Sequence, residues 1–359
     1  MVAALVACAA IAAGCGSSDN STSSGSSTSG SAASQKDPYT VYLSNSFMGN
    51  SFRVLMEKTA VVAAGEPPLK GKVDLKIANS DTSVTAQIAS LNQIIQQKPD
   101  AIIVTASSNT ALNSVIQKAC DQDIVVVSFD EVVTSPCAWK VSADANHIAD
   151  AWANWFAKSV KGKTEVFQDL GLPGNPLAKL FSDGLKKAQE LNPQIKVTCT
   201  FQSKYALGPE QEGVAKCLGA HPNVDGIWAM GYAGGAMKAL KEAGHPPVPV
   251  TGGAYNVGTT TCYDTKGECL LASYPAYIGA LALKTAVEIL DGANPPKDLS
   301  TKFPFFQQGG ADTTVPGETV KPLKVGESVF PDLDGGLVLP WQIPWAPQVT
   351  LDQIQAAKI

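Results

Sequence analysis

The sequence predicts an α/β fold of two doubly wound lobes with parallel sheets, and three observations carry that prediction. Short β-branched runs alternate with amphipathic segments from residue 38 onward. Several of these runs are apolar without alternation, which is typical of strands covered on both faces. The chain has 359 residues, too many for one average domain and enough for two.

Strands and helices are expected in turn along the chain. After a first strand at Val41-Tyr42-Leu43, the strand candidates are 73–78, 101–105, 124–129, 165–168, 195–200, 226–229 and 248–251. Between them, apolar residues recur at helical spacing: Ile88, Leu91, Ile94 and Ile95; then Leu112, Val115, Ile116 and Ala119; then Ile148, Trp152, Trp155 and Phe156. This alternation predicts parallel strands joined by right-handed helical crossovers.

Two terminal regions differ from this pattern. Residues 1–15 form a short apolar run of signal-peptide length, too short to span a bilayer, and residues 16–37 are a Ser/Gly-rich segment that predicts a flexible tether. Beyond residue 308 proline and glycine are dense and no period is present, which predicts an irregular C-terminal extension. We expect Trp341 and Trp345 in this extension to be packing anchors.

The end of the apolar run, Ala12-Ala13-Gly14-Cys15, followed by the tether, resembles a bacterial lipoprotein signal. The resemblance implies that Cys15 is lipidated and anchors the exported chain at the outer face of the cell membrane. A plain secretory signal with an incidental cysteine is the alternative.

Cysteine usage agrees with export. Apart from Cys8 and Cys15 the chain has six cysteines, an even number that suggests disulfides. In a doubly wound lobe a cysteine that ends a helix lies close to the loop after the next strand, and a strand packs on the helix that follows it. Pairing of neighbours along the sequence predicts Cys120–Cys137, Cys199–Cys217 and Cys262–Cys269.

Composition and motifs exclude several classes of function. A net charge of −5, with 27 basic and 32 acidic residues and no basic cluster, argues against nucleic-acid binding. The chain has no HExxH, no CxxC and no GxSxG outside the tether, and so no nucleophile–base pair or metal-ligand spacing stands out. We therefore expect no enzymatic activity, no cofactor and no metal.

A ligand site is expected where the strands end, because ligands of open parallel sheets bind beyond the carboxyl ends of the strands. Residues 46–53 follow the first strand, Asp130-Glu131 follow a later one, and Gly231-Tyr232 follow another. Each has a structural alternative: Asp130 could cap a turn and Phe52 could be a core residue. Their gathering at one sheet edge predicts a site for a small polar ligand.

Four segments resemble ribose-binding-protein-like periplasmic solute-binding proteins, the extracytoplasmic receptors of ABC sugar importers. They are YTVYLSNSFMGNSFRVLMEKTAV, KPDAIIVTASSNTALNSVIQKACDQDIVVVSFD, KVSADANHIADAWANWFAK and AHPNVDGIWAMGYAGGAMKALKEAG. The match covers residues 38 to about 306 and implies two Rossmann-like lobes joined by three crossing strands, with the ligand cleft between them. The first lobe would hold residues 38–143 and 275–306, and the second 144–274 with part of 307–359.

The resemblance also implies site residues in the first lobe. Ser46, Asn50 and Phe52 match the family's sugar-binding loop, and Arg53 stands where a second aromatic residue is common. The acidic residue that follows the fourth strand is Asp130.

At several further positions the chain departs from the family pattern. Glu131 replaces the arginine partner of Asp130, and Phe181 replaces an arginine of the second lobe, which leaves Lys179 as the nearest cation. The other matches or substitutes in the second lobe are Tyr205, Tyr232, Tyr255 and Asn256. The pocket therefore differs from that of a ribose receptor.

Physical chemistry assigns roles to these side chains. A hydroxyl-rich ligand has apolar C–H faces that suit Phe52 and Tyr205, and polar edges that suit the charged groups of Arg53 and Asp130. Arg53→Ala and Asp130→Ala are each expected to lower affinity about tenfold to a hundredfold while the fold stays intact.

The sequence thus predicts a monomeric, lipid-anchored receptor that hands a sugar, polyol or similar small molecule to an ABC permease. An extracytoplasmic sensor that signals to a membrane partner is an alternative that the sequence leaves open. A lac-repressor-type regulator would need a helix-turn-helix where the export signal and tether stand.

Overall fold

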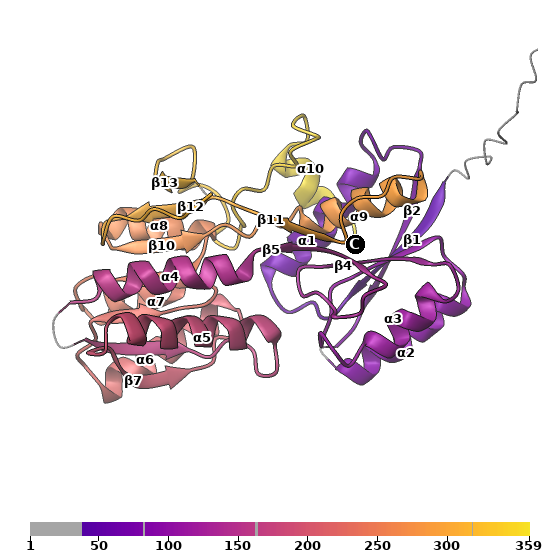
Figure 1. Cartoon of the computed structure of the whole chain (residues 1–359). Coiled ribbons are helices and arrows are strands. Elements are labelled where there is room, and N and C mark those ends of the chain that lie inside the picture. Colours follow the sequence, from indigo (N-terminus) through magenta and orange to yellow (C-terminus); the bar gives the residue numbers. More distant parts are fainter. Residues whose placement is uncertain (1–37, 82, 162–163, 318) are drawn as a thin grey trace, which may run out of the picture. The chain divides into compact units, whose positions relative to one another are not determined.

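The computed structural model describes residues 38–81, 83–161, 164–317 and 319–359, and these contain two sheets (Figure 1). Cys15 and the tether at 16–37 lie outside the described residues. The strands of the six-stranded sheet are all parallel and follow the order β11-β5-β4-β3-β1-β2. They are β1 (Tyr39–Asn45), β2 (Val73–Asn79), β3 (Ala101–Val104), β4 (Val125–Phe129), β5 (Trp139–Ala143) and β11 (Asp298–Thr301).

The seven-stranded sheet follows the order β13-β12-β10-β9-β8-β6-β7. It is parallel except where β10 pairs antiparallel with β12. Its strands are β6 (Glu165–Asp169), β7 (Lys196–Phe201), β8 (Gly226–Trp228), β9 (Val250–Gly253), β10 (Cys269–Ala272), β12 (Phe305–Gln308) and β13 (Val320–Pro322).

Helices cover both faces of each sheet (Figure 1). On the six-stranded sheet, α1 (Ser51–Ala64) and α9 (Ile278–Leu290) share one face, and α2 (Val84–Gln96) and α3 (Asn113–Cys120) share the other. On the seven-stranded sheet, one face carries α4 (Ala145–Ser159) and α5 (Pro176–Leu191), and the other carries α6 (Leu207–Ala220), α7 (Ala233–Glu242) and α8 (Asn256–Thr265). The predicted doubly wound α/β fold is confirmed.

We call the six-stranded sheet with α1, α2, α3 and α9 the first lobe, and the seven-stranded sheet with α4–α8 the second lobe. The chain passes between them after β5, after β10 and after β11. Because β12 pairs with β10, Phe305 and Phe306 belong to the second lobe and not to the first, where the sequence placed them.

The residues that make up the apolar patterns of the sequence form the cores of the lobes. All four residues of β3 are buried, as expected for a strand covered on both faces. The apolar stripe of α4 is buried too: the ring of Trp152 meets Trp228 edge to face at 5.9 Å, and Phe156 meets the same ring at 5.4 Å. These aromatic contacts fix α4 on the second sheet.

Three disulfides join neighbouring elements, in the pairs that the sequence predicts. Cys120–Cys137 links the end of α3 to the segment before β5, Cys199–Cys217 links β7 to α6, and Cys262–Cys269 links α8 to β10. Each closes a short loop, and loops of this size stabilise a fold by about 2–4 kcal/mol.

The chain after β12 is mostly irregular, as its composition predicts, apart from β13 and α10 (Leu351–Ala356). Trp345 packs edge-on against Tyr277 at 6.3 Å, and Trp341 packs against Phe330 at 5.1 Å. Both are therefore packing residues. Among the described helices, none combines the length and the apolar character needed to cross a bilayer.

Candidate functional site

A cavity of about 100 Å³ lies between residues of the two lobes. Its lining comes from the β1–α1 junction, the loops after β4 and β8, the loop between β7 and α6, the segments at the ends of β9 and β10, and the helices α4 and α5. The lining side chains with polar or aromatic groups are Phe47, Asn50, Phe52, Arg53, Asp130, Glu131, Trp152, Phe181, Tyr205, Tyr255 and Tyr274.

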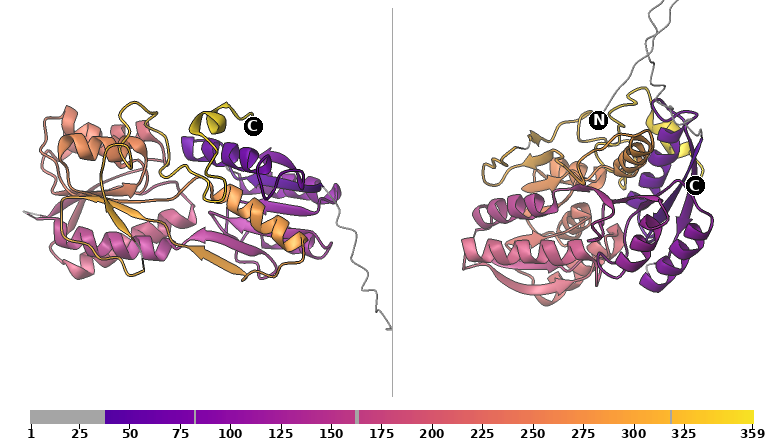
Figure 2. Two further views of the ribbon diagram at one scale, coloured as in Figure 1. Left: turned by 90° about the horizontal axis from the view of Figure 1, so that it is seen from above. Right: turned by 45° about the vertical axis from the view of Figure 1, so that its right-hand side comes forward.

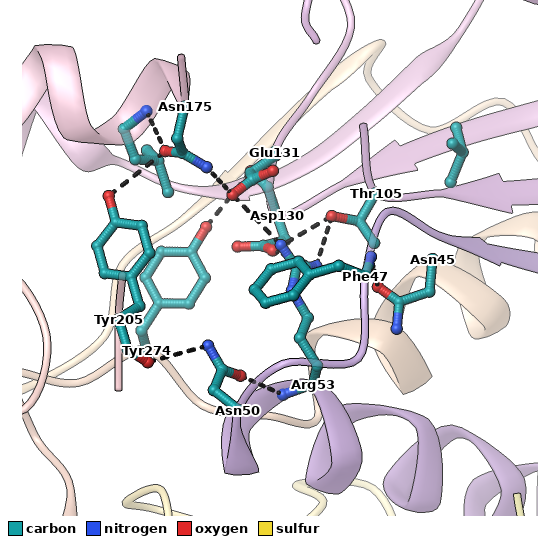
Figure 3. Close-up of polar contacts among 12 residues, drawn as sticks. Asn45, Phe47, Asn50, Arg53, Thr105, Asp130, Glu131, Asn175, Tyr205 and Tyr274 are labelled. Carbon is teal, nitrogen blue, oxygen red and sulfur yellow. Dashed lines mark hydrogen bonds and ion pairs between the residues drawn. The ribbon is translucent and has the colours of Figure 1, made fainter. Parts of the chain in front are cut away.

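The guanidinium of Arg53 is the centre of the cavity's polar side (Figure 3). Its Nη1 lies 2.8 Å from Asp130 Oδ2 and donates to Thr105 Oγ1 at 2.6 Å, and its Nη2 lies 3.3 Å from Glu131 Oε1. The rings of Phe47 and Phe52 lie 5.3 and 5.7 Å from its central carbon, within the range of cation–π attraction. With 3% of its surface exposed, Arg53 is a buried cation held by two acids.

The cluster has two carboxylates for one cation, and the pKa values reflect this. Burial alone lowers the pKa of Arg53, but the nearby charges of Asp130 and Glu131 outweigh burial, so the pKa lies above its ordinary value. Burial raises the pKa of Glu131 to about 7, against the lowering effect of Arg53 and with a further rise from the charge of Asp130. Near neutral pH the proton on Glu131 therefore decides the charge of the cavity.

Asn50 places Arg53 and also reaches the second lobe. As the cap of α1, its Oδ1 accepts from the backbone N–H of Arg53 at 3.0 Å. Its Nδ2 donates to the backbone oxygen of Tyr205 at 3.3 Å. Asn50 thereby couples the start of α1 to the opposite wall of the cavity.

Asn175 makes the matching contact from the second lobe (Figure 3). It caps α5, because its Oδ1 accepts from the backbone N–H groups of Leu177 at 2.9 Å and Ala178 at 3.1 Å. Its Nδ2 donates to Glu131 Oε1 across the lobes. The sequence pattern Asn175-Pro176 is typical of a helix start and could have identified the cap, but not its contact with Glu131.

Tyr205 sits in a tight loop that the carboxylate of Asp169 holds in place through Ser203. Its φ is +53°, and that of Lys204 is +51°. The carboxylate of Asp169 accepts from Ser203 N at 2.9 Å and from Ser203 Oγ at 2.6 Å, and Ser203 Oγ in turn accepts from Tyr205 N at 3.1 Å. The phenol of Tyr205 reaches Asn175 Oδ1 at 3.4 Å, and burial raises its pKa, so it stays neutral.

The second lobe also supplies an apolar wall. Trp152, Leu177, Phe181 and Met230 of this lobe line the cavity. Phe181 packs on Trp152 with ring centroids 4.9 Å apart, at the position where the family resemblance implies an arginine. The first lobe therefore supplies the charged groups of the cavity, and the second lobe supplies apolar surface to it.

The structure brings seven of the predicted residues into the lining: Asn50, Phe52, Arg53, Asp130, Glu131, Tyr205 and the possible substitute Tyr255. It adds Phe47, Asn175 and Tyr274, which the sequence reading missed. Phe47 and Tyr274 line the cavity, and Asn175 contacts Glu131 beside it. That the lining residues bind a ligand stays a prediction.

Four predicted binding residues lie outside the lining, and we correct their placement. Lys179 is 80% exposed and pairs with Asp183 at 2.5 Å on the outer face of α5. The Ser46 side chain is buried, and its hydroxyl has no hydrogen-bond partner among the described residues. Tyr232 and Asn256 each stand one residue beyond a lining position, Gly231 and Tyr255, and their side chains point to other partners.

The sequence of this chain is similar to those of known binding proteins. A family model described as a periplasmic binding protein domain matches residues 41–294. The ribose import binding protein RbsB of Bacillus subtilis is 24% identical over 283 residues, which cover 77% of this chain and 90% of that protein. The D-ribose/D-allose-binding protein of Pseudomonas aeruginosa is 22% identical and covers 69% of this chain and 81% of its own length.

Solved structures show the same fold. An ABC transporter solute binding protein from Thermobispora bispora superposes with a TM-score of 0.67 at 28% identity, covering 74% of this chain and 84% of its own. A galactofuranose binding protein also gives a TM-score of 0.67, at 21% identity, over 75% and 95% of the two chains. At that identity the second likeness concerns the fold alone.

Proposed function

The chain belongs to the family of periplasmic binding protein domains, and from this premise we propose that it is an extracytoplasmic receptor that delivers a sugar or polyol to an ABC importer. The observation that carries the proposal is the cavity between the lobes, where Arg53, Asp130 and Glu131 meet aromatic rings. The names of the curated relatives, which are ribose and ribose/allose binding proteins, support the same class of ligand. We assign no catalytic step to these residues.

The geometry suits capture by two closing lobes. Glu131 and Asn50 belong to the first lobe, and their partners Asn175 and Tyr205 belong to the second. A ligand in the cavity would touch both walls, so its binding energy would favour the arrangement in which the lobes are joined. This arrangement also removes the charged cluster from water, which strengthens its hydrogen bonds to a ligand.

The mixture of charged and apolar groups in the cavity lining narrows the class of ligand further. A carbohydrate hydroxyl can bond to Arg53, Asp130 or Glu131, whereas Trp152, Phe181 and Met230 present mostly apolar surface. A hydroxyl buried against that wall without a partner would cost about 1–3 kcal/mol. We therefore propose a ligand with one hydroxyl-rich edge and one apolar edge, such as a deoxy sugar.

Matched sugar pairs test this ligand class. We expect D-fucose to bind about tenfold more tightly than D-galactose, or L-rhamnose than L-mannose, because each deoxy sugar replaces a hydroxyl with a hydrogen. Isothermal titration calorimetry would follow a thermal-shift screen that also holds ribose, allose, polyols, acids and aromatics. Tighter binding of the fully hydroxylated partners would contradict the apolar edge, and stabilisation by none of the sugars or polyols would contradict the receptor itself.

We also propose that the receptor is held at the outer face of the membrane by a lipid on Cys15, from the small residues before this cysteine and the tether after it. Cys15→Ser is expected to abolish incorporation of labelled fatty acid and to release the protein from the membrane fraction. Cys8→Ser, which changes a cysteine within the same leader, is the control and should behave as the parent. Membrane retention of Cys15→Ser, with no label on the parent, would contradict lipidation.

A further inference from the structure

The last part of the chain contacts both lobes and lies beyond the family match, which ends at residue 294. We call residues 323–359 the C-terminal segment. Figure 2 shows it in yellow, passing from the second lobe to α1. Its apolar residues Leu337, Leu339, Ile343 and Ile354 are buried, so it is an integrated part of the structure.

On the second lobe, the segment caps α8. The first helical N–H groups of α8 have no intrahelical partners, and the preceding Tyr255 provides no side-chain cap. Instead, the backbone N–H of Asn256 donates to Leu337 O and that of Val257 donates to Gly335 O, both at 2.8 Å.

The side chain of Asn256 adds further bonds to the same segment. Its Nδ2 lies 2.8 Å from Phe330 O and 3.1 Å from Leu333 O, and its Oδ1 accepts from Phe330 N at 3.1 Å. This explains why Asn256 does not face the cavity: its amide is used to hold the segment.

On the first lobe, the segment is anchored to α1 and α9. Trp345 packs on Tyr277 beside α9, Gln348 Nε2 donates to Glu66 Oε2 at 2.8 Å, and α10 packs on α1. Only the residues between Leu339 and Trp345 join these two sets of anchors, and Pro340 and Pro344 restrict their backbone. The segment is thus a further short connection between the lobes.

Outside the cavity lining, one hydroxyl joins this segment to both lobes. Ser51, the first residue of α1, donates through its Oγ to Gly336 O at 2.9 Å. Tyr232 OH lies 2.5 Å from the same Oγ and is then the donor of that bond, since the serine proton is already engaged. A Cβ at Gly336 would lie 2.7 Å from Ser51 Oγ, so the close approach needs glycine here.

The same bonds support a wall of the cavity. The Tyr232 ring stacks on Tyr255 with centroids 3.9 Å apart and planes at 21°, and Tyr255 lines the cavity. Val338 of the C-terminal segment pairs with the backbone of Tyr255 in a β-bridge. Tyr255 is therefore held from behind by Tyr232 and along its backbone by the segment.

We propose that Ser51, Tyr232 and the C-terminal segment form a latch that positions Tyr255 and keeps the lobes joined around the ligand. The latch residues are positioning residues, because they act through Tyr255 and through the lobe arrangement. The effect of the latch on ligand dissociation rests on the proposed function. Its effect on the arrangement of the lobes rests on the contacts within the chain. The latch sets the dissociation rate of the ligand.

Two measurements test the latch. Ser51→Ala and Tyr232→Phe are each expected to raise the dissociation rate of D-fucose, followed by stopped-flow tryptophan fluorescence, about 2–10-fold, the effect of one hydrogen bond. Because the two residues share a bond, the double variant should fall short of the product of the two single effects. Ser51→Thr keeps a hydroxyl and should restore slow dissociation.

The second measurement needs no ligand. Small-angle X-ray scattering should give a larger radius of gyration for the Ser51→Ala, Tyr232→Phe double variant than for the parent. Gln211→Ala removes an exposed hydrogen bond to Glu242 within the second lobe, outside the latch, and it should leave both readouts unchanged. Parental scattering and parental dissociation in the double variant would overturn the latch. Failure of D-fucose to bind the parent would count against the proposed ligand, while scattering still decides the latch.

Discussion

Replacing Arg53 with methionine is expected to lower the free energy of unfolding by about 3–5 kcal/mol at pH 7.5, the cost of removing one partner from a buried ion pair. Asp130 and Glu131 are both buried, and Arg53 lies within salt-bridge distance of each. Without it, two carboxylates would share one low-dielectric site. Because Arg53 is buried, we expect this loss of stability in place of the sequence-based expectation that its substitution leaves folding intact.

Urea unfolding followed by circular dichroism measures this change. Lys76→Met is the matched control, because it removes a cation that is 46% exposed and 3.7 Å from Asp74, and surface pairs of this kind contribute about 0–1 kcal/mol. Arg53→Lys should fall between parent and methionine variant, since an ammonium keeps the charge but not the fork that reaches both acids. An Arg53→Met protein as stable as Lys76→Met would show that the cluster is not held by this cation.

The fold was predictable because its determinants are local. Apolar runs such as those of β3 and β4, and stripes such as that of α4, carry their period within a few residues. The C-terminal segment has no period, and its destination depends on partners far away in the sequence: Asn256 bonds to Phe330, and Gln348 bonds to Glu66. Its irregular character could therefore be predicted, but not its anchoring to both lobes.

The site was predictable to the level of the loops but not of every side chain. Loops after parallel strands must converge, so the groups around Arg53 and Asp130 were found. Which residue of a loop faces inward depends on its backbone: Asp130 and Tyr205 both have a positive φ, and such turns leave no simple period in the sequence. The contact between Glu131 and Asn175 arises only where the lobes meet.

The cluster of Arg53, Asp130 and Glu131 has two acids for one cation, and we therefore expect the stability of the protein to depend on pH. Glu131 has a pKa of about 7 in the folded protein, raised first by burial, against an ordinary value of 4.5. Between these values the folded state holds a proton that the unfolded state has released. Stability is therefore fully present below about pH 4.5 and is lost as pH rises through 7. The expected loss is about 3 kcal/mol between pH 4.5 and pH 8.

Glu131→Gln removes this titration while keeping an oxygen that can accept from Asn175 and Arg53. We expect the variant to be more stable than the parent at pH 8, with the difference shrinking toward pH 5. The titratable groups around Glu131 do not mask this pH dependence. Arg53 stays charged, and the phenols of Tyr205 and Tyr274 stay neutral because burial raises their pKa values. Asp169 and Glu210, whose pKa values burial also raises, remain in both proteins and cancel in the comparison.

Urea unfolding at pH 5, 6, 7 and 8 would measure the difference between parent and variant. Glu212→Gln is the control, because Glu212 is an exposed acid paired with Lys216, and its loss should leave the pH profile of the parent nearly unchanged. A constant stability difference between parent and Glu131→Gln across this range would mean that Glu131 stays charged in the folded protein.

Arg53→Met and Glu131→Gln together separate the roles of the cation and the acid. Loss of the cation should lower stability most at high pH, where Glu131 is charged, and loss of the acid should raise stability most at the same pH. Opposite signs at the same pH are what an excess of buried negative charge requires.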